Sequence, residues 1–384
     1  MTEDQQDKTT ALYDEHVALG ASMTGFGGWL MPLRYTSDLA EHRAVRDAAG
    51  LFDLSHMGEI HLTGPQAGAA LDHALVGRAS AIKVGRARYS MICAEDGAVL
   101  DDLITYRLGD EHFLVVANAG NAVRVARELV DRAAGFDAVV DDRSETTALA
   151  AVQGPRAEEI LAGLTAAADV ETVRTMRYYA SAPATVAGVE LLVARTGYTG
   201  EDGFELFVDA DRAVELWRAL LAAGEPLGLV PAGLSARDSL RLEAGMPLYG
   251  HELDETTTPF EAGMGRVVKL DKTDDAGAPL PFVGRAALEA RAHSEPARVL
   301  VGLRGQGRRP ARAGYDVVRR GLNGEVGAVV GRVTSGAPSP TLGYPVAMAY
   351  VTPEVSAEGT ELAVDVRGRA EPFVVVPLPF YRRS

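Results

Sequence analysis

The sequence changes its pattern near residue 297, and this change constrains the fold more than any other feature. Beyond it, short apolar runs alternate with turn residues at near-regular spacing, which is typical of a small β-barrel or a β-sandwich. The expected strands are 299–303, 315–318, 327–334, 346–351, 361–366 and 372–376. We therefore expect a separate C-terminal β domain over residues 298–384.

Before this change, helical and strand patterns alternate along the chain. Strand–helix–strand units with antiparallel pieces predict an α+β region with helices on one face of a sheet, here over residues 11–290. Four helices are expected. The first spans 37–49, with Ser37 as its N-cap and Gly50 ending it, and the second spans 121–134. The third has Pro155 as its first residue, and the fourth is capped by Asp211 and ends at Gly224. The expected strands are 113–116, 149–152, 190–194 and 204–208.

Two polar loops, 273–282 and 292–297, break the pattern before the C-terminal domain, and residues 1–10 are expected to form a disordered tail. The 384 residues suffice for two or three domains. The formal net charge of −15 argues against a nucleic-acid-binding protein. No apolar run is long enough to span a bilayer, and the acidic N-terminus does not resemble a signal peptide. The single cysteine, Cys93, has apolar neighbours and excludes an intrachain disulfide, so we expect a cytoplasmic protein.

Two adjacent acids, Asp101 and Asp102, follow an apolar run within a predicted strand. Neighbouring side chains of a strand point to opposite faces, so we expect one carboxylate to face inward and the other to meet solvent. A carboxylate held against apolar surface is costly unless it has a partner. Such a cost is typical of a site that handles protons or orients a cation, although a solvent-facing turn would also explain the pair.

Several familiar chemistries find no support in the sequence. There is no P-loop, and the Gly-rich stretch 195–203 lacks both the phosphate-binding lysine and the spacing of a dinucleotide-binding loop. His56 and His61 are five residues apart, which is wrong for a zinc pair on a helix, so no metal site is expected. No nucleophile elbow is present.

Six strings remain: FDLSHMGE (52–59), GAVLDDLI (97–104), VVANAGN (115–121), TGYTGEDGFEL (196–206), ARDSLRLE (236–243) and VTSGAPSPTLG (333–343). In this order and spacing they resemble the aminomethyltransferase of the glycine cleavage system, the T-protein family, from about residue 12 to residue 381. The resemblance implies a three-domain cloverleaf, with a folate-binding α+β region of two intertwined subdomains and a small C-terminal β-barrel.

The resemblance also implies the reaction. The family takes an aminomethyl group from the lipoyl arm of the H protein, transfers its methylene to tetrahydrofolate as co-substrate, and releases 5,10-methylenetetrahydrofolate, dihydrolipoyl H protein and ammonia. No nucleic acid or membrane partner is implied. The loop 273–282 is longer than the link usual in the family, which leaves the domain boundary there open.

By the same resemblance, Asp102 is the catalytic acid, acting either as a base or as an electrostatic stabiliser. Glu205 accepts hydrogen bonds from the pterin edge, and Arg237 binds the glutamate tail of the folate. The other residues implied to surround the folate are Met57, Tyr89, Tyr106, Val116, Asn118, Tyr178, Tyr198 and Tyr381.

Two other functions are compatible with parts of this pattern. A folate-dependent demethylase of a small N-methyl or sulfonium compound would reuse the pterin site with another donor, and dependence on a lipoylated carrier would distinguish it. A folate-binding factor for iron–sulfur proteins is disfavoured, because its Lys-Gly-Cys-aromatic motif is absent and Cys93 lies in SMICA.

Overall fold

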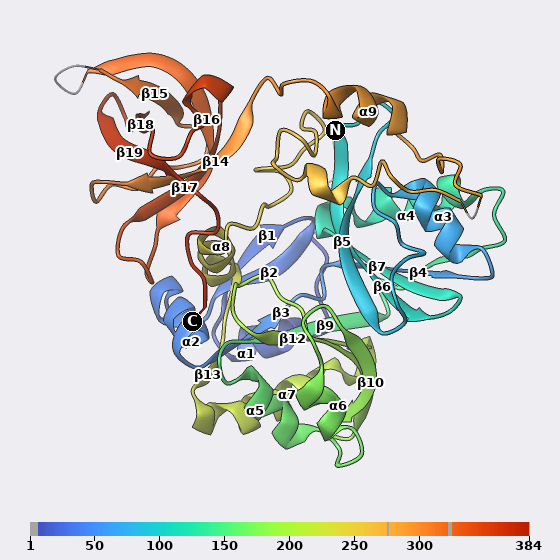
Figure 1. The fold of residues 1–384 in the computed structure, drawn as a ribbon. Helices are drawn as coiled ribbons and strands as arrows, with labels where there is room; N and C mark the ends of the chain where they lie inside the picture. The colour runs from blue at the N-terminus through green and yellow to red at the C-terminus, as the bar shows by residue number, and fades with distance from the viewer. Residues whose placement is uncertain (1–6, 275, 322–324, 384) are drawn as a thin grey trace, which may run out of the picture.

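Three folded parts surround a common centre in the computed structural model, which describes residues 7–274, 276–321 and 325–383. Figure 1 shows a six-stranded sheet with its helices at the bottom, a five-stranded sheet at the right and a barrel at the upper left. Within the described residues, no helix is both long enough and apolar enough to cross a membrane.

The six-stranded sheet has the order β10-β11-β12-β9-β3-β13. Its strands pair antiparallel except β13, which runs parallel to β3. Helices α5, α6 and α7 cover one face (Figure 1), where Leu216, Trp217 and Leu220 of α7 are fully buried. The bounds are β3 Ala49–Asp53, β9 Thr147–Gln153, α5 Ala157–Leu164, α6 Val170–Thr175, β10 Ser181–Val186, β11 Val189–Ala194, β12 Gly203–Asp209, α7 Ala213–Gly224 and β13 Leu229–Pro231.

The five-stranded sheet has the order β5-β6-β7-β4-β8. Along β7, Val115 packs into the core that includes α4 residues, whereas Leu114 and Val116 pack with residues of the six-stranded sheet such as Phe207. The two sheets therefore face each other across a shared apolar layer. The bounds are β4 Gly58–Thr63, α3 Ala67–Ala74, β5 Arg86–Cys93, β6 Val99–Gly109, β7 His112–Ala117, α4 Ala122–Ala133 and β8 Val139–Asp142.

The C-terminal strands form a closed barrel in the order β14-β17-β16-β15-β18-β19, so of the two architectures that the pattern allowed the barrel is confirmed. Alternate side chains, among them Leu303, Val317, Ala347 and Phe373, fill its interior. The bounds are β14 Val299–Gly305, β15 Asp316–Arg320, β16 Val326–Pro338, β17 Pro345–Val351, β18 Glu361–Asp365 and β19 Ala370–Val376.

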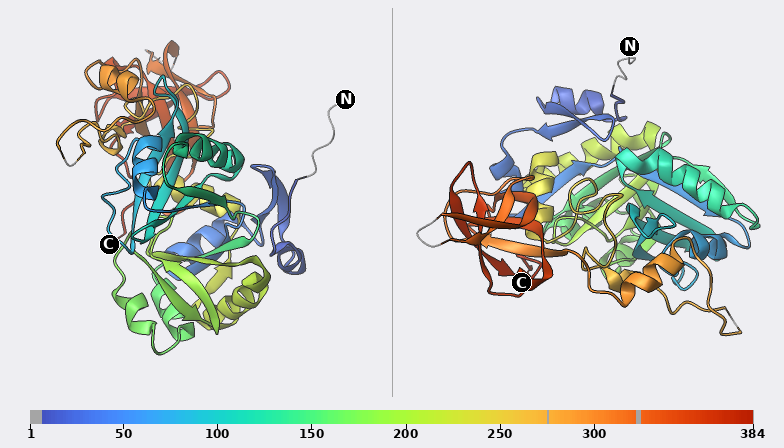
Figure 2. Two further views of the ribbon diagram at one scale, coloured as in Figure 1. Left: turned by 90° about the vertical axis from the view of Figure 1, so that its right-hand side faces the viewer. Right: turned by 90° about the horizontal axis from the view of Figure 1, so that it is seen from above.

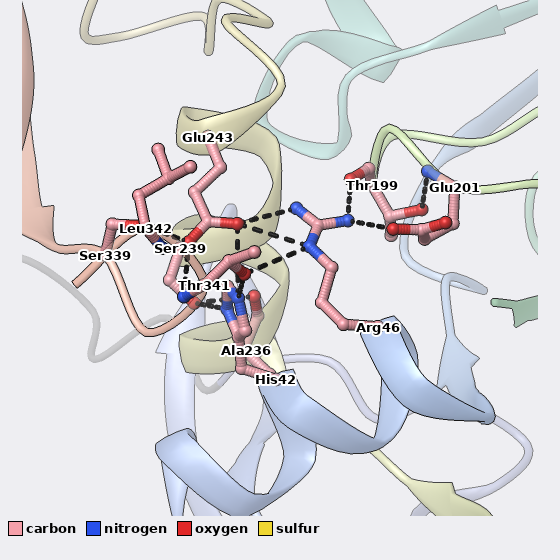
Figure 3. Close-up of polar contacts among 10 residues, drawn as sticks. All are labelled: His42, Arg46, Thr199, Glu201, Ala236, Ser239, Glu243, Ser339, Thr341 and Leu342. Carbon is pink, nitrogen blue, oxygen red and sulfur yellow. Dashed lines mark hydrogen bonds and ion pairs between the residues drawn. The ribbon is translucent and has the colours of Figure 1, made fainter. Parts of the chain in front are cut away.

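A cluster of buried polar side chains connects the barrel to helices α2 (Asp38–Asp47) and α8 (Leu234–Glu243). Figure 3 shows Glu243 of α8 between His42 and Arg46 of α2 and the loop 339–342 that leads from β16 to β17. Arg46 Nη2 lies 2.8 Å from Glu243 Oε2, and His42 Nε2 lies 2.8 Å from Thr341 Oγ1. A second nitrogen of Arg46, Nη1, donates to Glu201 over 2.8 Å.

The first described residues are packed rather than free. Lys8 bridges to Trp29, and Thr10 is buried and donates a hydrogen bond of 2.7 Å to Asp53. The expected disordered tail is therefore wrong for residues 8–10, and residues 1–6 lie outside the described part of the chain. Figure 2 shows α1 (Tyr13–Ala18) and the unpredicted hairpin of β1 (Ser22–Phe26) and β2 (Trp29–Arg34) at one edge of the molecule.

The expected helices are all present, with differences at their starts and ends. The Ser37 side chain caps α2 by accepting from the N–H of Ala40 over 3.2 Å, as expected, but Gly50 lies inside β3 rather than stopping the helix. Asp211 lies in a short 3₁₀ turn before α7 and is not its cap, and α5 begins two residues after Pro155. Local turns of this kind shift helix starts by one or two residues.

The buried side chain of Lys272 connects the segment after α8 to the part of the molecule that contains the five-stranded sheet. The Nζ atom of Lys272 donates to the carbonyl oxygens of Asp72, Leu75 and Gly77 at 2.6, 2.7 and 2.8 Å, at and just beyond the end of α3. The ammonium thus satisfies carbonyl groups that the helix end leaves without partners.

We predict that Lys272→Met lowers the free energy of unfolding by about 3 kcal/mol or more, because three buried carbonyl oxygens lose their donor. Urea denaturation of purified protein measures this change. The matched control is Lys269→Met, three residues earlier and half-buried, for which we expect a change within about 0.5 kcal/mol. Equal midpoints for the two variants would contradict the role given to Lys272.

Candidate active site

A cavity of about 450 Å³ lies between the two facing sheets and is completed by the chain that follows α8. Its size suits one small organic molecule. The apolar part of its wall includes Phe26, Leu54, Met57, Ile104, Val116, Leu149, Met246, Leu248 and Met264. The polar and aromatic part includes His56, Tyr89, Asp102, Tyr106, Asn118, Tyr179, Tyr198, Glu205, Arg237 and Tyr249.

The two adjacent acids of β6 point to opposite faces of the sheet, as strand alternation requires. Asp102 lines the cavity. Asp101 is fully buried behind it and accepts from the backbone N–H of Asn118 at 3.0 Å and from the side-chain amides of Asn118 and Asn121 at 2.9 and 2.7 Å. The expectation that one acid meets bulk solvent is therefore wrong, because the turn that begins α4 covers Asp101.

Two hydrogen bonds fix the Asp102 carboxylate. Tyr89 of β5 donates its hydroxyl to Oδ2 over 3.0 Å, and the Asn118 amide donates to Oδ1 over 2.9 Å. Burial raises the pKa of Asp102 to about 6 and that of Asp101 to about 7, the latter also through the charge of Asp102. The two carboxyls therefore titrate as a coupled pair near neutral pH, where a group can both accept and return a proton.

Glu205 reaches the cavity from β12 of the other sheet. Its Oε2 accepts a hydrogen bond from the Tyr106 hydroxyl at 3.3 Å and another from Thr196 Oγ1. No described residue donates to Oε1. One oxygen is thus held by the protein, while the carboxylate keeps acceptor capacity for a ligand that offers two adjacent N–H donors.

Arg237 of α8 brings a positive charge to the same cavity. Its guanidinium stacks over the Tyr198 ring at 4.6 Å, and none of the described carboxylates forms an ion pair with it. The neighbouring Asp238 pairs instead with Arg241 at 2.7 Å, so the simple explanation of Arg237 as a paired surface arginine fails. Burial lowers the pKa of Arg237 because it disfavours the charged guanidinium, a cost that contact with an anionic group would offset.

The cavity unites nine of the eleven residues implied by the resemblance, and two lie elsewhere. Tyr178 and Tyr381 line a second, polar pocket with Arg195 and Arg383, and the Tyr381 ring stacks on Arg46 at 4.0 Å. Tyr179, the next residue along, lines the main cavity in place of Tyr178. The resemblance implied Tyr178, but the backbone of Tyr179 has φ of 60°, in the left-handed region, and the two neighbouring tyrosines line different pockets.

Other wall residues were not singled out from the sequence. Phe26 and Gly27 come from the β1–β2 hairpin, whose Gly-Gly pair between Phe26 and Trp29 is a recognisable turn signal. His56 lies inside the string 52–59 but received no role. Burial lowers its pKa to about 4, so this imidazole is neutral at physiological pH. Met246 and Leu248 follow α8 in a segment without strand or helix pattern.

The arrangement can bind a flat, polar ring between apolar walls and place it beside a carboxylate that titrates near neutrality. It offers no nucleophilic cysteine, since Cys93 is buried in another cluster and burial raises its pKa to about 12. No group of three or more His, Cys, Asp or Glu suited to hold a metal ion occurs among the residues that the structure describes.

Known proteins resemble this chain over nearly its full length. Residues 12–272 match the family model described as the GCVT N-terminal domain, and residues 298–382 match the glycine cleavage T-protein C-terminal barrel domain. An aminomethyltransferase of Streptomyces coelicolor is 60% identical over 381 residues, covering 98% of both chains. One of Saccharopolyspora erythraea is 58% identical over 377 residues, covering 98% of this chain and 99% of the relative.

A solved structure agrees with these sequence matches. The glycine cleavage system aminomethyltransferase T from Bartonella henselae superposes with a TM-score of 0.86 at 38% identity, and the match covers 97% of this chain and 98% of that one. Two family models, relatives that match over nearly their full length and a shared fold lead to one assignment: the chain belongs to the glycine cleavage T-protein family of aminomethyltransferases.

Proposed function

We propose that this enzyme transfers the aminomethyl-derived methylene from the lipoyl arm of the H protein to tetrahydrofolate. The products are 5,10-methylenetetrahydrofolate, dihydrolipoyl H protein and ammonia. The observation that carries the proposal is the pairing, in one cavity, of a carboxylate with spare acceptor capacity and a carboxylate whose pKa lies near neutrality.

Recognition of the folate is assigned to Glu205 and Arg237. The edge of a pterin presents a ring N–H beside an exocyclic amine, and a carboxylate such as Glu205 can accept both. The glutamate tail carries carboxylates, for which the Arg237 guanidinium is a matching donor because no described acid neutralises it. Aromatic and apolar side chains, among them Tyr106, Val116 and Met57, supply flat walls for the rings.

Asp102 is assigned to the reacting end of the substrate. Tetrahydrofolate supplies the nucleophilic nitrogen of the reaction. Positive charge develops as the methylene is transferred from the lipoyl arm to this nitrogen and ammonia leaves. A carboxylate fixed by Tyr89 and Asn118 can stabilise that charge without reorganising, or accept the proton that the nitrogen loses. Asp101 does not face the cavity and interacts with Asp102 through the shared Asn118 amide and through the mutual repulsion of the two charges.

The partner and the location belong to the same proposal. The donor is a lipoylated carrier, the H protein, whose arm must reach Asp102 through the mouth of the cavity. A cytoplasmic location fits a chain whose single cysteine is buried and unreacted, since reducing compartments keep such thiols free.

The deciding assay measures 5,10-methylenetetrahydrofolate formed from tetrahydrofolate and aminomethyl-loaded lipoyl carrier, with the wild type and Asp102→Asn side by side. We expect turnover by the wild type and a loss of a hundredfold or more in kcat for the variant, with folate binding retained. The amide keeps the size of Asp102 but cannot take a proton or carry charge.

Carrier without a lipoyl group serves as the control substrate and should give no product. Folate binding without turnover on the loaded carrier would overturn the proposed donor and lead to the demethylase of a small N-methyl or sulfonium compound. Normal turnover by Asp102→Asn would remove Asp102 from the reaction while leaving the overall function standing.

A second prediction concerns pH. If ionised Asp102 is the active form, kcat/KM rises with pH through an acid limb at about 6 to 7, where the Asp101–Asp102 pair loses its protons. Because the Tyr89 hydroxyl lowers the pKa of Asp102, Tyr89→Phe should move this limb to higher pH. A limb that stays in place in the variant would speak against Asp102 as the titrating group.

A third prediction separates recognition from chemistry. Glu205→Gln replaces one acceptor oxygen by a donor amide, which opposes the two donors of a pterin edge, so we expect the Kd for tetrahydrofolate to rise at least about tenfold. Titration calorimetry measures this value. Glu190→Gln, on the neighbouring strand β11 and exposed, is the matched control and should bind normally. Equal affinities would refute the role of Glu205.

A further inference from the structure

The charge of the chain is divided unevenly between its parts. Residues 298–384 contain 12 arginines, no lysine and only seven acidic residues, whereas the remaining residues contain 46 acidic and 26 basic ones. The barrel region therefore carries a net positive charge, whereas the rest of the chain carries a strongly negative net charge. Such an asymmetry orients a protein in the field of a charged partner.

Ion pairs neutralise only some of the exposed barrel arginines. Arg319, Arg320 and Arg332 lie 3.6, 2.8 and 3.4 Å from Glu354, Glu361 and Asp316, respectively. Between residues 299 and 376, five others are exposed and form no ion pair with any acid in the described ranges. We call these five the arginine rim; they are Arg304, Arg308, Arg312, Arg367 and Arg369.

Four of the five lie on two neighbouring segments of the barrel, the loop that follows β14 and the hairpin between β18 and β19, and Arg304 lies near the end of β14. Arg312, Arg367 and Arg369 line one open pocket there, together with Arg309, which Glu371 partly neutralises at 2.9 Å. Pro310, Tyr315 and Val366 also line this pocket. None of these residues lines the cavity between the sheets.

Such a pocket combines the features of a protein docking surface. Several guanidinium groups close together repel one another and gain by contact with carboxylates, for which their fork geometry is well suited. Tyrosine and arginine are the residue types that contribute most at protein interfaces, and apolar side chains beside charged ones exclude water from the contact.

We propose that this end of the barrel is a docking surface for an acidic segment of a partner protein, one that presents two or more carboxylates to the arginine rim. The proposal does not rest on the reaction assigned to the cavity. It predicts binding that is sensitive to salt, because exposed charges are screened over about 10 Å at ordinary ionic strength.

The test uses a short fluorescent poly-L-glutamate peptide as the probe and fluorescence anisotropy as the readout. The triple variant R312Q/R367Q/R369Q is compared with R319Q/R320Q/R332Q, which loses the same charge from arginines of the same barrel that have acidic partners. We expect the wild type to bind the peptide at low salt, the first variant to bind roughly fivefold or more weakly, and the second to bind nearly as the wild type does.

Thermal melting and aminomethyltransferase activity of both variants establish that the fold and the cavity are intact. Equal losses in the two variants would overturn the proposal, because attraction would then follow total charge rather than this surface. Absence of peptide binding by the wild type would also overturn it. ATP serves as a second probe, and binding of ATP with no binding of peptide would assign the pocket to small phosphates instead of a protein.

Discussion

The buried carboxylate of Glu243 is the contact that holds the barrel against helices α2 and α8 beside the six-stranded sheet. Burial alone would raise its pKa, but hydrogen bonds from His42, Ser339 and Arg46 outweigh that effect and lower the pKa to about 2. Helix α2 leads into the six-stranded sheet, α8 carries Arg237, and the loop 339–342 belongs to the barrel. The Glu243 carboxylate therefore connects segments that are distant in sequence. Removing Arg46 would take away the guanidinium that pairs with this buried carboxylate, a loss that is costly in the interior of a protein.

Much of the fold follows from local pattern. The six barrel strands and the helices α2 and α4 are recognisable because apolar periodicity and turn residues agree within each segment. The hairpin of β1 and β2 was not predicted, because its residues show no clean alternation of apolar and polar side chains. Its position is fixed by contacts such as the backbone bridge from Lys8 to Trp29. The cap at Asp211 fails because a 3₁₀ turn competes with direct helix initiation.

Residues of the site could be predicted where a recognisable motif lies on a strand. Asp102 and Glu205 are such residues: the resemblance named both, and both line the cavity. Residues could not be predicted where tertiary packing decides. The left-handed backbone of Tyr179 turns that side chain inward and leaves Tyr178 outside. Nor does sequence distinguish a solvent-facing Asp101 from one covered by the turn at Asn118 and Asn121, since that cover comes from another strand's end.

The hydrogen bond from Tyr106 of one sheet to Glu205 of the other has an implication for how such an enzyme can change over evolutionary time. The two halves of the cavity sit on separate scaffolds, so either half can be remodelled while the other keeps its geometry. What they cannot change independently is their spacing, which the layer containing Leu114, Val116 and Phe207 sets. A ligand with a larger ring would therefore require the two sheets to move apart together, because the close-packed layer between them has no spare space.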